Sequence, residues 1–211
     1  MIVKTSELDQ KEIYKLLIGS VVPRPIAWVS TINADNITNL APFSYFTVAS
    51  SYPPVLCFSP GLKGDLRDGE VVAVPKDTLR NIEETKEFVV NIVSANLAEQ
   101  MNNTSAEYAP SVSEFERSGL TEAASSMVRP PRVGEALISM ECRLNQIVRL
   151  GTAPGAGNLV LGDVLCFHID DSIYKAGHID IHALNPIGRL SGNSYCRVVE
   201  QIFELRRPSA N

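Results

Sequence analysis

The residues best suited to chemistry lie between positions 75 and 88. Asp77 or Thr78 is a good N-cap for a helix, because apolar residues at helical spacing follow them. Lys76 then lies just outside the helix N-terminus, where free backbone N–H groups and the positive end of the helix dipole favour an anion such as a phosphate. Thr78 can add a hydroxyl donor, and Asn81, three residues further on, can reach the same face.

A capped helix with a solvated lysine is the simpler explanation of this segment taken alone. Asp77 also opposes an incoming phosphate unless its carboxylate is engaged in capping. The phosphate hypothesis therefore needs a matching ring-binding surface elsewhere in the chain.

Two upstream stretches, residues 23–31 and 39–46, supply such a surface. Each mixes apolar strand residues with hydroxyl groups and small side chains, a combination that suits a planar, partly polar ring lying against a sheet. Asn39 and Ser44 could answer the ring's carbonyl and nitrogen atoms, while Phe46 packs against its apolar parts. Each aromatic residue alone is more simply explained as barrel core, so the prediction depends on the set.

The elements that must position these residues are mostly strands. Short runs rich in β-branched and aromatic residues predict four strands, at residues 26–32, 40–48, 55–59 and 88–93. Clean alternation over 138–144 predicts a fifth strand, whose apolar phase slips at Asn145 and Gln146 and so indicates a β-bulge. Residues 159–169 predict a sixth strand, with 151–157 as the hairpin loop before it.

Helices are fewer and short, predicted over residues 8–17, 95–101 and 113–116, the last with capping-box spacing. Many strands, few peripheral helices and no regular βαβ alternation predict a mainly β fold, a β-barrel with peripheral helices rather than a doubly wound sheet. The chain has 211 residues and nothing typical of an interdomain linker, so we expect a single domain over 1–211.

Composition narrows the class of protein. With 45% hydrophobic and 20% charged residues the chain can fold alone, and its formal net charge of -5 argues against a nucleic-acid partner. Residues 1–17 lack the unbroken apolar core of a signal peptide, and no apolar run is long enough to span a bilayer. We therefore expect a cytoplasmic protein with no membrane association.

The cysteines and one histidine suggest packing rather than chemistry. Four cysteines are far apart and form no C-x-x-C pair, so we expect buried free thiols. They are Cys57, Cys142, Cys166 and Cys196. His168 is expected on one strand face with Val164 and Cys166, as a partly buried structural histidine.

Other motifs also have simple explanations. The glycine-rich loop 151–157 precedes strand-like residues rather than a helix, which argues against a dinucleotide-binding turn. His178 and His182 have metal-pair spacing, but the Ile-Asp-Ile-His alternation between them favours a surface loop over a helix. Arg-Pro-Pro-Arg at 129–132 is typical of a stiff surface connector. We therefore predict no metal site.

Five ordered motifs resemble the flavin reductase-like family, a flavoredoxin-like group of FMN-binding split barrels. They are P-R-P-I-A-W-V-S-T from residue 23, N-L-A-P-F-S-Y-F from 39, P-P-V-L-C-F-S-P from 53, P-K-D-T-L-R-N-I from 75 with E-F-V-V-N-I following, and N-P-I-G-R-L-S-G-N-S-Y-C-R from 185. The resemblance runs from about Gly19 to Glu204, which is nearly the whole chain.

This resemblance implies a split barrel that binds FMN noncovalently and forms a homodimer. The positions that would line the flavin ring and ribityl chain are Thr31, Asn39, Ala41, Pro42, Ser44 and Phe46. Those that would hold the phosphate end are Lys76, Asp77, Thr78 and Asn81, with Ser59 nearby. Arg24 joins the cofactor-binding set, and Arg189 and Tyr195 would complete the pocket from the C-terminal segment or from the dimer partner.

The implied function is redox chemistry carried by the cofactor, so we nominate no catalytic side chain. The preferred hypothesis is an NAD(P)H-dependent flavin oxidoreductase that uses NADH or NADPH as co-substrate and passes electrons to flavin, a metal complex, another small-molecule acceptor or a redox protein. The alternative is a noncatalytic FMN-binding electron carrier or flavin store. A different phosphorylated planar ligand, such as pyridoxal phosphate or a different flavin form, is a third hypothesis. The sequence does not separate NADH from NADPH, nor a tightly bound cofactor from a substrate.

Overall fold

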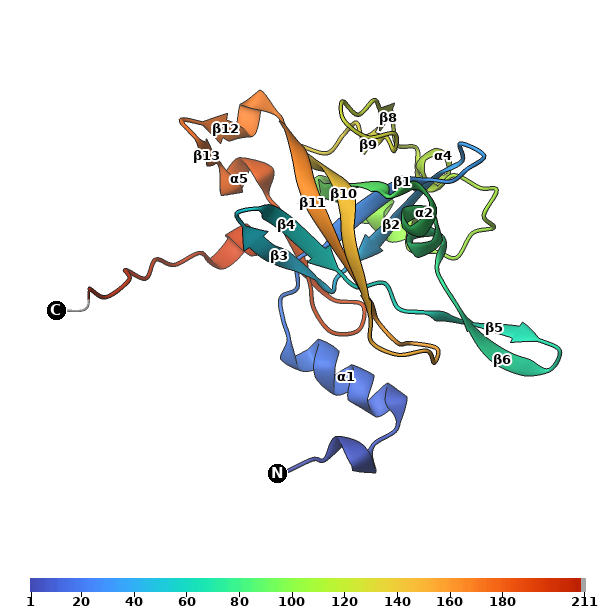
Figure 1. The fold of residues 1–211 in the computed structure, drawn as a ribbon. Helices are drawn as coiled ribbons and strands as arrows, with labels where there is room; N and C mark the ends of the chain where they lie inside the picture. The colour runs from blue at the N-terminus through green and yellow to red at the C-terminus, as the bar shows by residue number, and fades with distance from the viewer. Residues whose placement is uncertain (210–211) are drawn as a thin grey trace.

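Seven strands form one antiparallel sheet in the computed structural model, which describes residues 1–209 (Figure 1). Their order across the sheet is β2-β1-β7-β10-β11-β4-β3. The strands are β1 (Ala27–Ile32), β2 (Thr38–Phe43), β3 (Phe46–Ser51), β4 (Pro54–Phe58), β7 (Glu87–Ile92), β10 (Ile138–Arg149) and β11 (Asn158–Ile169). Every strand predicted from the sequence therefore contributes to this one sheet.

The two edge strands of the sheet, β2 and β3, follow one another in the chain with only Ser44 and Tyr45 between them. Because three peptide steps span at most about 11 Å, the sheet must curl until the end of β2 lies close to the start of β3. The carbonyl oxygen of Tyr45 accepts a 2.9 Å hydrogen bond from the N–H of Ser59, which ties the link to the end of β4. The predicted mainly β barrel with peripheral helices is confirmed, and it is split along this seam between β2 and β3.

Three aromatic rings pack together in the barrel interior among mostly aliphatic side chains. The ring of Phe58 lies between those of Phe43 and Phe88, with centroid distances of 5.2 and 5.6 Å. Gly162 in β11 faces Phe88, and a Cβ atom at that position would lie 2.9 Å from Cε1 of the ring and closer still to Cζ. Only glycine lets the fully buried Phe88 ring pack here, because a dense core has no spare volume.

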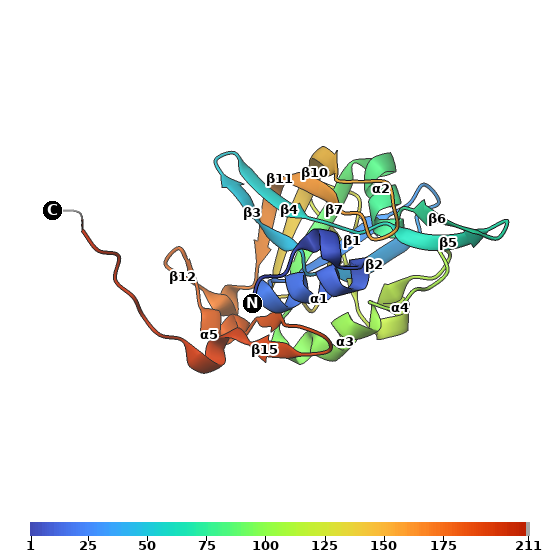
Figure 2. The same cartoon turned by 90° about the horizontal axis from the view of Figure 1, so that it is seen from below.

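Short helices surround the sheet. They are α1 (Gln10–Ser20), α2 (Asp77–Thr85), α3 (Ala98–Asn103), α4 (Glu114–Ser118) and α5 (Ile181–Leu184), with 3-10 turns η1 (Thr5–Glu7), η2 (Ala95–Leu97), η3 (Asp171–Ile173) and η4 (Val198–Gln201). Leu79 and Ile82 of α2 are fully buried in the barrel core. Seen from below, α1 lies in front of the strands (Figure 2). Within residues 1–209, no helix is long and apolar enough to cross a bilayer.

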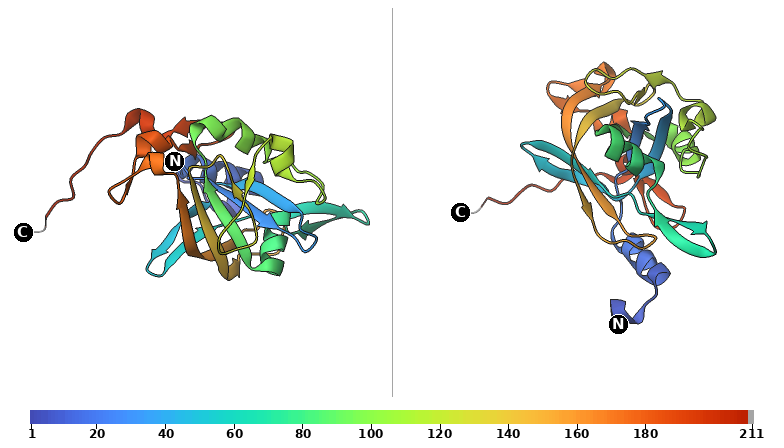
Figure 3. Two further views of the ribbon diagram at one scale, coloured as in Figure 1. Left: turned by 90° about the horizontal axis from the view of Figure 1, so that it is seen from above. Right: turned by 45° about the vertical axis from the view of Figure 1, so that its right-hand side comes forward.

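Four two-stranded ribbons complete the fold. They are β5 (Lys63–Arg67) with β6 (Glu70–Val74), β8 (Glu122–Ala123) with β9 (Arg132–Val133), β12 (Tyr174–Lys175) with β13 (His178–Ile179), and β14 (Ile187–Arg189) with β15 (Tyr195–Arg197). The β5–β6 hairpin projects from the body, and the chain after η4 runs away from it (Figures 1 and 3). Asp68 and Gly69 at the tip of β5–β6 both have positive φ, as an Asp-Gly hairpin turn requires.

Two predicted boundaries are wrong. The single strand expected over 40–48 is two strands, because the chain leaves one edge of the sheet for the other at Ser44. Neither Asp77 nor Thr78 is the N-cap of α2; the N-cap is Lys76, and no side chain caps the helix. The carboxylate of Asp77 instead forms an ion pair with Arg80, one turn further along the helix.

The strand pair β10–β11 contains two bulges, and only one of them was predicted. The pairing slips at Asn145, as the apolar phase indicated, and it slips again at Leu165, between the pairs Glu141–Cys166 and Cys142–Val164. Paired residues share a face and successive residues alternate, so Cys166 lies on the opposite face from Val164. The prediction that His168 shares the face of Val164 is therefore wrong.

The expectation of buried cysteines holds for only one of the four. Cys142 is fully buried in the barrel core, and burial raises its pKa further above an already high value. The other three thiols, of Cys57, Cys166 and Cys196, are half-buried, and all four cysteines are free.

Candidate functional site: a groove along the barrel seam

A groove made of three adjoining cavities follows the split between β2 and β3. The first, of about 580 Å³, lies between α1, the end of β2 and the C-terminal ribbon; the second, of about 910 Å³, lies between α1 and the end of β4. The third, of about 190 Å³, lies at the N-terminus of α2. Pro42 lines all three, Ser44 and Tyr45 line the first two, and Lys76 lines the last two. The seam that closes the barrel therefore forms the floor of the groove.

The third cavity has the features of an anion site. The N–H groups of the first turn of α2 have no side-chain cap, and Lys76 stands beside them. Lys63, from the β5–β6 hairpin, adds a second cation that the sequence did not single out. The carboxylate of Asp77 is paired with Arg80, so its charge is partly offset.

Next to this cavity, both the oxygen and the nitrogen of the Asn39 side-chain amide are hydrogen-bonded. The hydroxyl of Thr78 donates a 2.7 Å hydrogen bond to Oδ1 of Asn39, and the hydroxyl of Thr31 lies 3.4 Å from the same oxygen. Asn81 donates from Nδ2 to the Thr31 hydroxyl at 3.0 Å. Nδ2 of Asn39 donates to the carboxylate of Glu114 at 2.9 and 3.0 Å. This chain of hydrogen bonds fixes the amide before any ligand arrives.

Glu114 is the main residue of the site that the sequence did not reveal. It begins α4, is 6% exposed, and also accepts the backbone N–H of Leu40 at 2.9 Å. Burial raises the pKa of Glu114, the hydrogen bonds from Leu40 and Asn39 partly offset that rise, and the charge of Asp77 adds to it. No local pattern marks this residue, because its partners lie about 75 residues earlier in the chain.

Arg24 forms the buried base of the first cavity. Its guanidinium group donates to the carbonyl oxygens of Ile18 at 2.8 Å, Val21 at 2.6 Å and Leu190 at 2.9 Å. A longer contact, 3.4 Å, joins its Nε to the hydroxyl of Ser44. One side chain thus joins the end of α1, the seam and the C-terminal segment, and most of its donors already have acceptors.

The C-terminal ribbon supplies the opposite wall. The guanidinium of Arg189 lies 4.4 Å from the centre of the Tyr195 ring and is hydrogen-bonded to the Tyr195 hydroxyl. The carbonyl of Gly192 accepts a further hydrogen bond from Arg189 at 2.5 Å. Both side chains line the first cavity within this one chain.

The groove gathers most of the predicted cofactor-binding residues. Those that line it are Arg24, Asn39, Ala41, Pro42, Ser44, Ser59, Lys76, Asp77, Thr78, Arg189 and Tyr195. Thr31 and Asn81 are buried behind Asn39, and Phe46 packs against the barrel core. The sequence did not single out Tyr14, Lys63 or Glu114, although all three line the groove.

The chain matches a known family model, curated relatives and solved structures. Residues 18–183 match the model of the flavin reductase like domain. An uncharacterised protein of Aquifex aeolicus (strain VF5) is 41% identical over 192 residues, covering 90% of this chain and 92% of its own.

Two solved structures are similar over essentially the whole chain. Nitrilotriacetate monooxygenase component B from Bacillus cereus has a TM-score of 0.87 at 38% identity, covering 97% of this chain and 98% of that one. The 2-nitrobenzoate 2-nitroreductase NbaA of Pseudomonas fluorescens has a TM-score of 0.85 at 29% identity, with 100% of each chain covered.

The buried carboxyl group of Glu114 predicts a pH dependence of stability. Its pKa is raised above the ordinary value of 4.5, so its contribution to stability is fully present below that pH and is lost as the pH rises through the folded-state pKa. Glu114→Gln does not titrate. The difference in unfolding free energy, wild type minus variant, should therefore decrease as the pH rises through this window, measured by urea unfolding from about pH 4 to about pH 7. A difference that does not vary with pH would contradict the raised pKa.

Proposed function

The chain belongs to the flavin reductase-like domain family, and on that premise we propose that it binds FMN in the seam groove and acts as an NAD(P)H-dependent flavin oxidoreductase. A flavin accepts a hydride and releases electrons singly or in pairs to a small-molecule or protein acceptor. The chain's own residues would bind and orient the reactants.

The cavity at the start of α2 supports FMN over a flavin without phosphate. Its uncapped N–H groups, Lys76 and Lys63 match the charge and the acceptor oxygens of a terminal phosphate. The Thr78 hydroxyl already donates its hydrogen to Asn39. It could therefore donate to a phosphate only if it rotated away from Asn39. Binding would thus rest more on the backbone and the lysines than on Thr78.

The seam itself suits the ring of the cofactor. Pro42 and Ala41 present small, apolar surface, while Ser44 offers a hydroxyl within reach of the same groove. Because Arg24 contacts the Ser44 hydroxyl in the link and Glu114 holds Leu40 of β2, the ring would meet a rigid surface. Rigidity of this kind lowers the entropic cost of binding.

One observation favours a reductase over a passive carrier. The first and second cavities each have the size of a small-ligand site, about 300–1,000 Å³, and they share four lining residues. The shared residues are Tyr14, Pro42, Ser44 and Tyr45. A flavin in the groove would therefore leave adjacent space for a nicotinamide ring.

The reductase proposal predicts flavin bleaching by a reduced nicotinamide. The purified protein, loaded with FMN and desalted, should keep the flavin spectrum and lose it on anaerobic addition of NADH or NADPH. The nucleotide that bleaches the flavin identifies the donor. Retained flavin that stays oxidised with both nucleotides would overturn the reductase proposal in favour of a carrier or flavin store, and absence of any flavin binding would overturn the FMN proposal.

If the phosphate of FMN binds at the N-terminus of α2, removing a positive charge there should weaken FMN binding, whereas removing one at the other end of the helix should not. Lys76→Gln should weaken FMN binding about tenfold, near the lower end of what a hydrogen bond to a charged group contributes, about 1.5 kcal/mol. Lys86→Gln, at the other end of the same helix, removes the same charge and should have little effect. Riboflavin, which lacks the phosphate, should bind both variants as it binds the wild type. Equal FMN affinity of the two variants in calorimetric titration would place the phosphate elsewhere.

We also propose that the protein is a homodimer in the cytoplasm. Tyr52 and Val48 on the β3–β4 hairpin, and Phe203 and Leu205 on the C-terminal segment, expose large apolar side chains that a second copy could cover. The four free cysteines suit a reducing compartment. Sedimentation of the full chain at micromolar concentration should give twice the chain mass, and a single monomeric species would contradict the dimer.

A further inference from the structure

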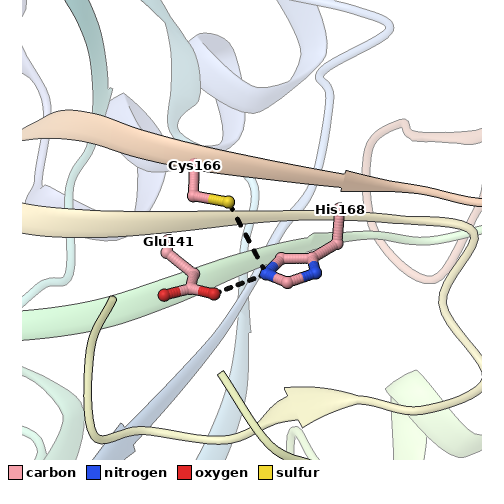
Figure 4. A group of neighbouring side chains, drawn as sticks. All are labelled: Glu141, Cys166 and His168. Carbon is pink, nitrogen blue, oxygen red and sulfur yellow. Dashed lines mark hydrogen bonds and ion pairs between the residues drawn. The ribbon is translucent and has the colours of Figure 1, made fainter. Parts of the chain in front are cut away.

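The bulge at Leu165 brings three potential metal ligands together on one face of the sheet (Figure 4), and none of them lines the groove. Glu141 lies on β10, and Cys166 and His168 lie on the adjacent strand β11. Nε2 of His168 lies 2.5 Å from Oε1 of Glu141 and 3.8 Å from Sγ of Cys166. Because the register pairs Glu141 directly with Cys166, the backbone itself sets this spacing.

The Glu141 carboxylate is oriented by backbone groups from a separate loop. The N–H of Ser126 donates to Oε1 at 2.7 Å, and those of Met127 and Val128 donate to Oε2 at 2.5 and 3.0 Å. Oε2 is therefore fully engaged, whereas Oε1 keeps a lone pair directed at His168. Metal-binding carboxylates typically have this kind of supporting hydrogen-bond shell.

The arrangement does not fit a nucleophilic relay. A Cys–His–acid relay uses both ring nitrogens, one toward the thiol and the other toward the carboxylate. In this cluster both Sγ of Cys166 and Oε1 of Glu141 approach the same atom, Nε2 of His168. One ligand atom from each of the three residues lies within 4.8 Å of the other two, which is close enough for all three to bind one metal ion.

We propose that Glu141, Cys166 and His168 bind a divalent transition-metal ion of the zinc class. Thiolate, imidazole and carboxylate are the three ligand types that zinc accepts, and three protein ligands with one open position form a common zinc arrangement. Tetrahedral zinc places neighbouring S and N ligands about 3.6 Å apart and N and O ligands about 3.4 Å apart. The observed 3.8 Å is near the first value, and a small tilt of the His168 ring would open the 2.5 Å contact.

The cluster is accessible from one side. The Glu141 side chain is fully buried, whereas the His168 side chain is 23% exposed and Cys166 is half-buried. A metal ion would therefore enter past His168 and Cys166 and keep a water as its fourth ligand. On binding, the Cys166 thiol releases its proton, and Nε2 of His168 must present its lone pair. The ion would link β11, just past its bulge, to Glu141 and through it to the loop at residues 126–128.

The test measures metal binding by the full chain after treatment with a chelator and a reductant. Titration with Zn²⁺ should give one site per chain, and Co²⁺ should give thiolate-to-cobalt charge-transfer absorption. Cys166→Ser and His168→Gln should each weaken Zn²⁺ binding at least about tenfold, the lower end of what losing even an outer-shell partner costs, and Cys166→Ser should abolish the charge-transfer absorption. Glu141 is left unchanged, because it holds three backbone N–H groups and its loss would endanger folding.

The chain offers matched controls for the cysteine and histidine ligands. Cys57→Ser removes another half-buried thiol, and a His178→Gln, His182→Gln double variant removes two exposed histidines. Both should bind Zn²⁺ as the wild type does. No stoichiometric binding, or binding lost with His178 and His182 but kept in Cys166→Ser, would overturn the proposal. Neither measurement involves flavin, so the test of the metal site does not depend on whether the proposed function is correct.

Discussion

The two-residue link between β2 and β3 is the constraint on which the rest of the molecule depends. A sheet whose first and last strands are consecutive in the chain cannot stay open, so hydrogen bonding across seven strands and the short link together force a barrel. β2 pairs only with β1 and β3 only with β4, so the two edge strands are not hydrogen-bonded to each other and a furrow remains along the seam. The groove is therefore a direct product of barrel closure, and the residues of the link, Ser44 and Tyr45, necessarily line it.

Buried polar groups then determine what surrounds this furrow. The side-chain NH₂ group of Asn39, on β2, finds its acceptor in Glu114, which begins α4. On the adjacent strands, Asn91 accepts hydrogen bonds from the Ser139 hydroxyl and the Val133 N–H, and so holds the 124–133 loop against the sheet. Each such group would destabilise the fold if left without a partner, so these hydrogen bonds hold the loops against the strands.

The sequence predicted what depends on local pattern and missed what depends on distant partners. Alternation and β-branched runs located the sheet strands and the Asn145 bulge, and the residues after Pro75 located the end of the groove at the N-terminus of α2. Glu114 reaches Asn39 from 75 residues further along the chain, and Lys63 reaches the site from the β5–β6 hairpin; neither has a local pattern of its own. The bulge at Leu165 lies in an unbroken apolar run, where one extra residue leaves no trace in the alternation, so the face of His168 was predicted wrongly. The Asp68-Gly69 pair was a usable signal for β5–β6 that the strand pattern did not exploit.

The hydrogen bonds of the Arg24 guanidinium cannot all form at the same stage of synthesis of the chain. Its partners Ile18 and Val21 are synthesised just before it, whereas Leu190 follows 166 residues later. At about 5–20 residues per second, that separation corresponds to roughly ten to thirty seconds of translation. During this interval the growing chain lacks Leu190 and the C-terminal ribbon, so the first cavity is complete only once the last ribbon has been made.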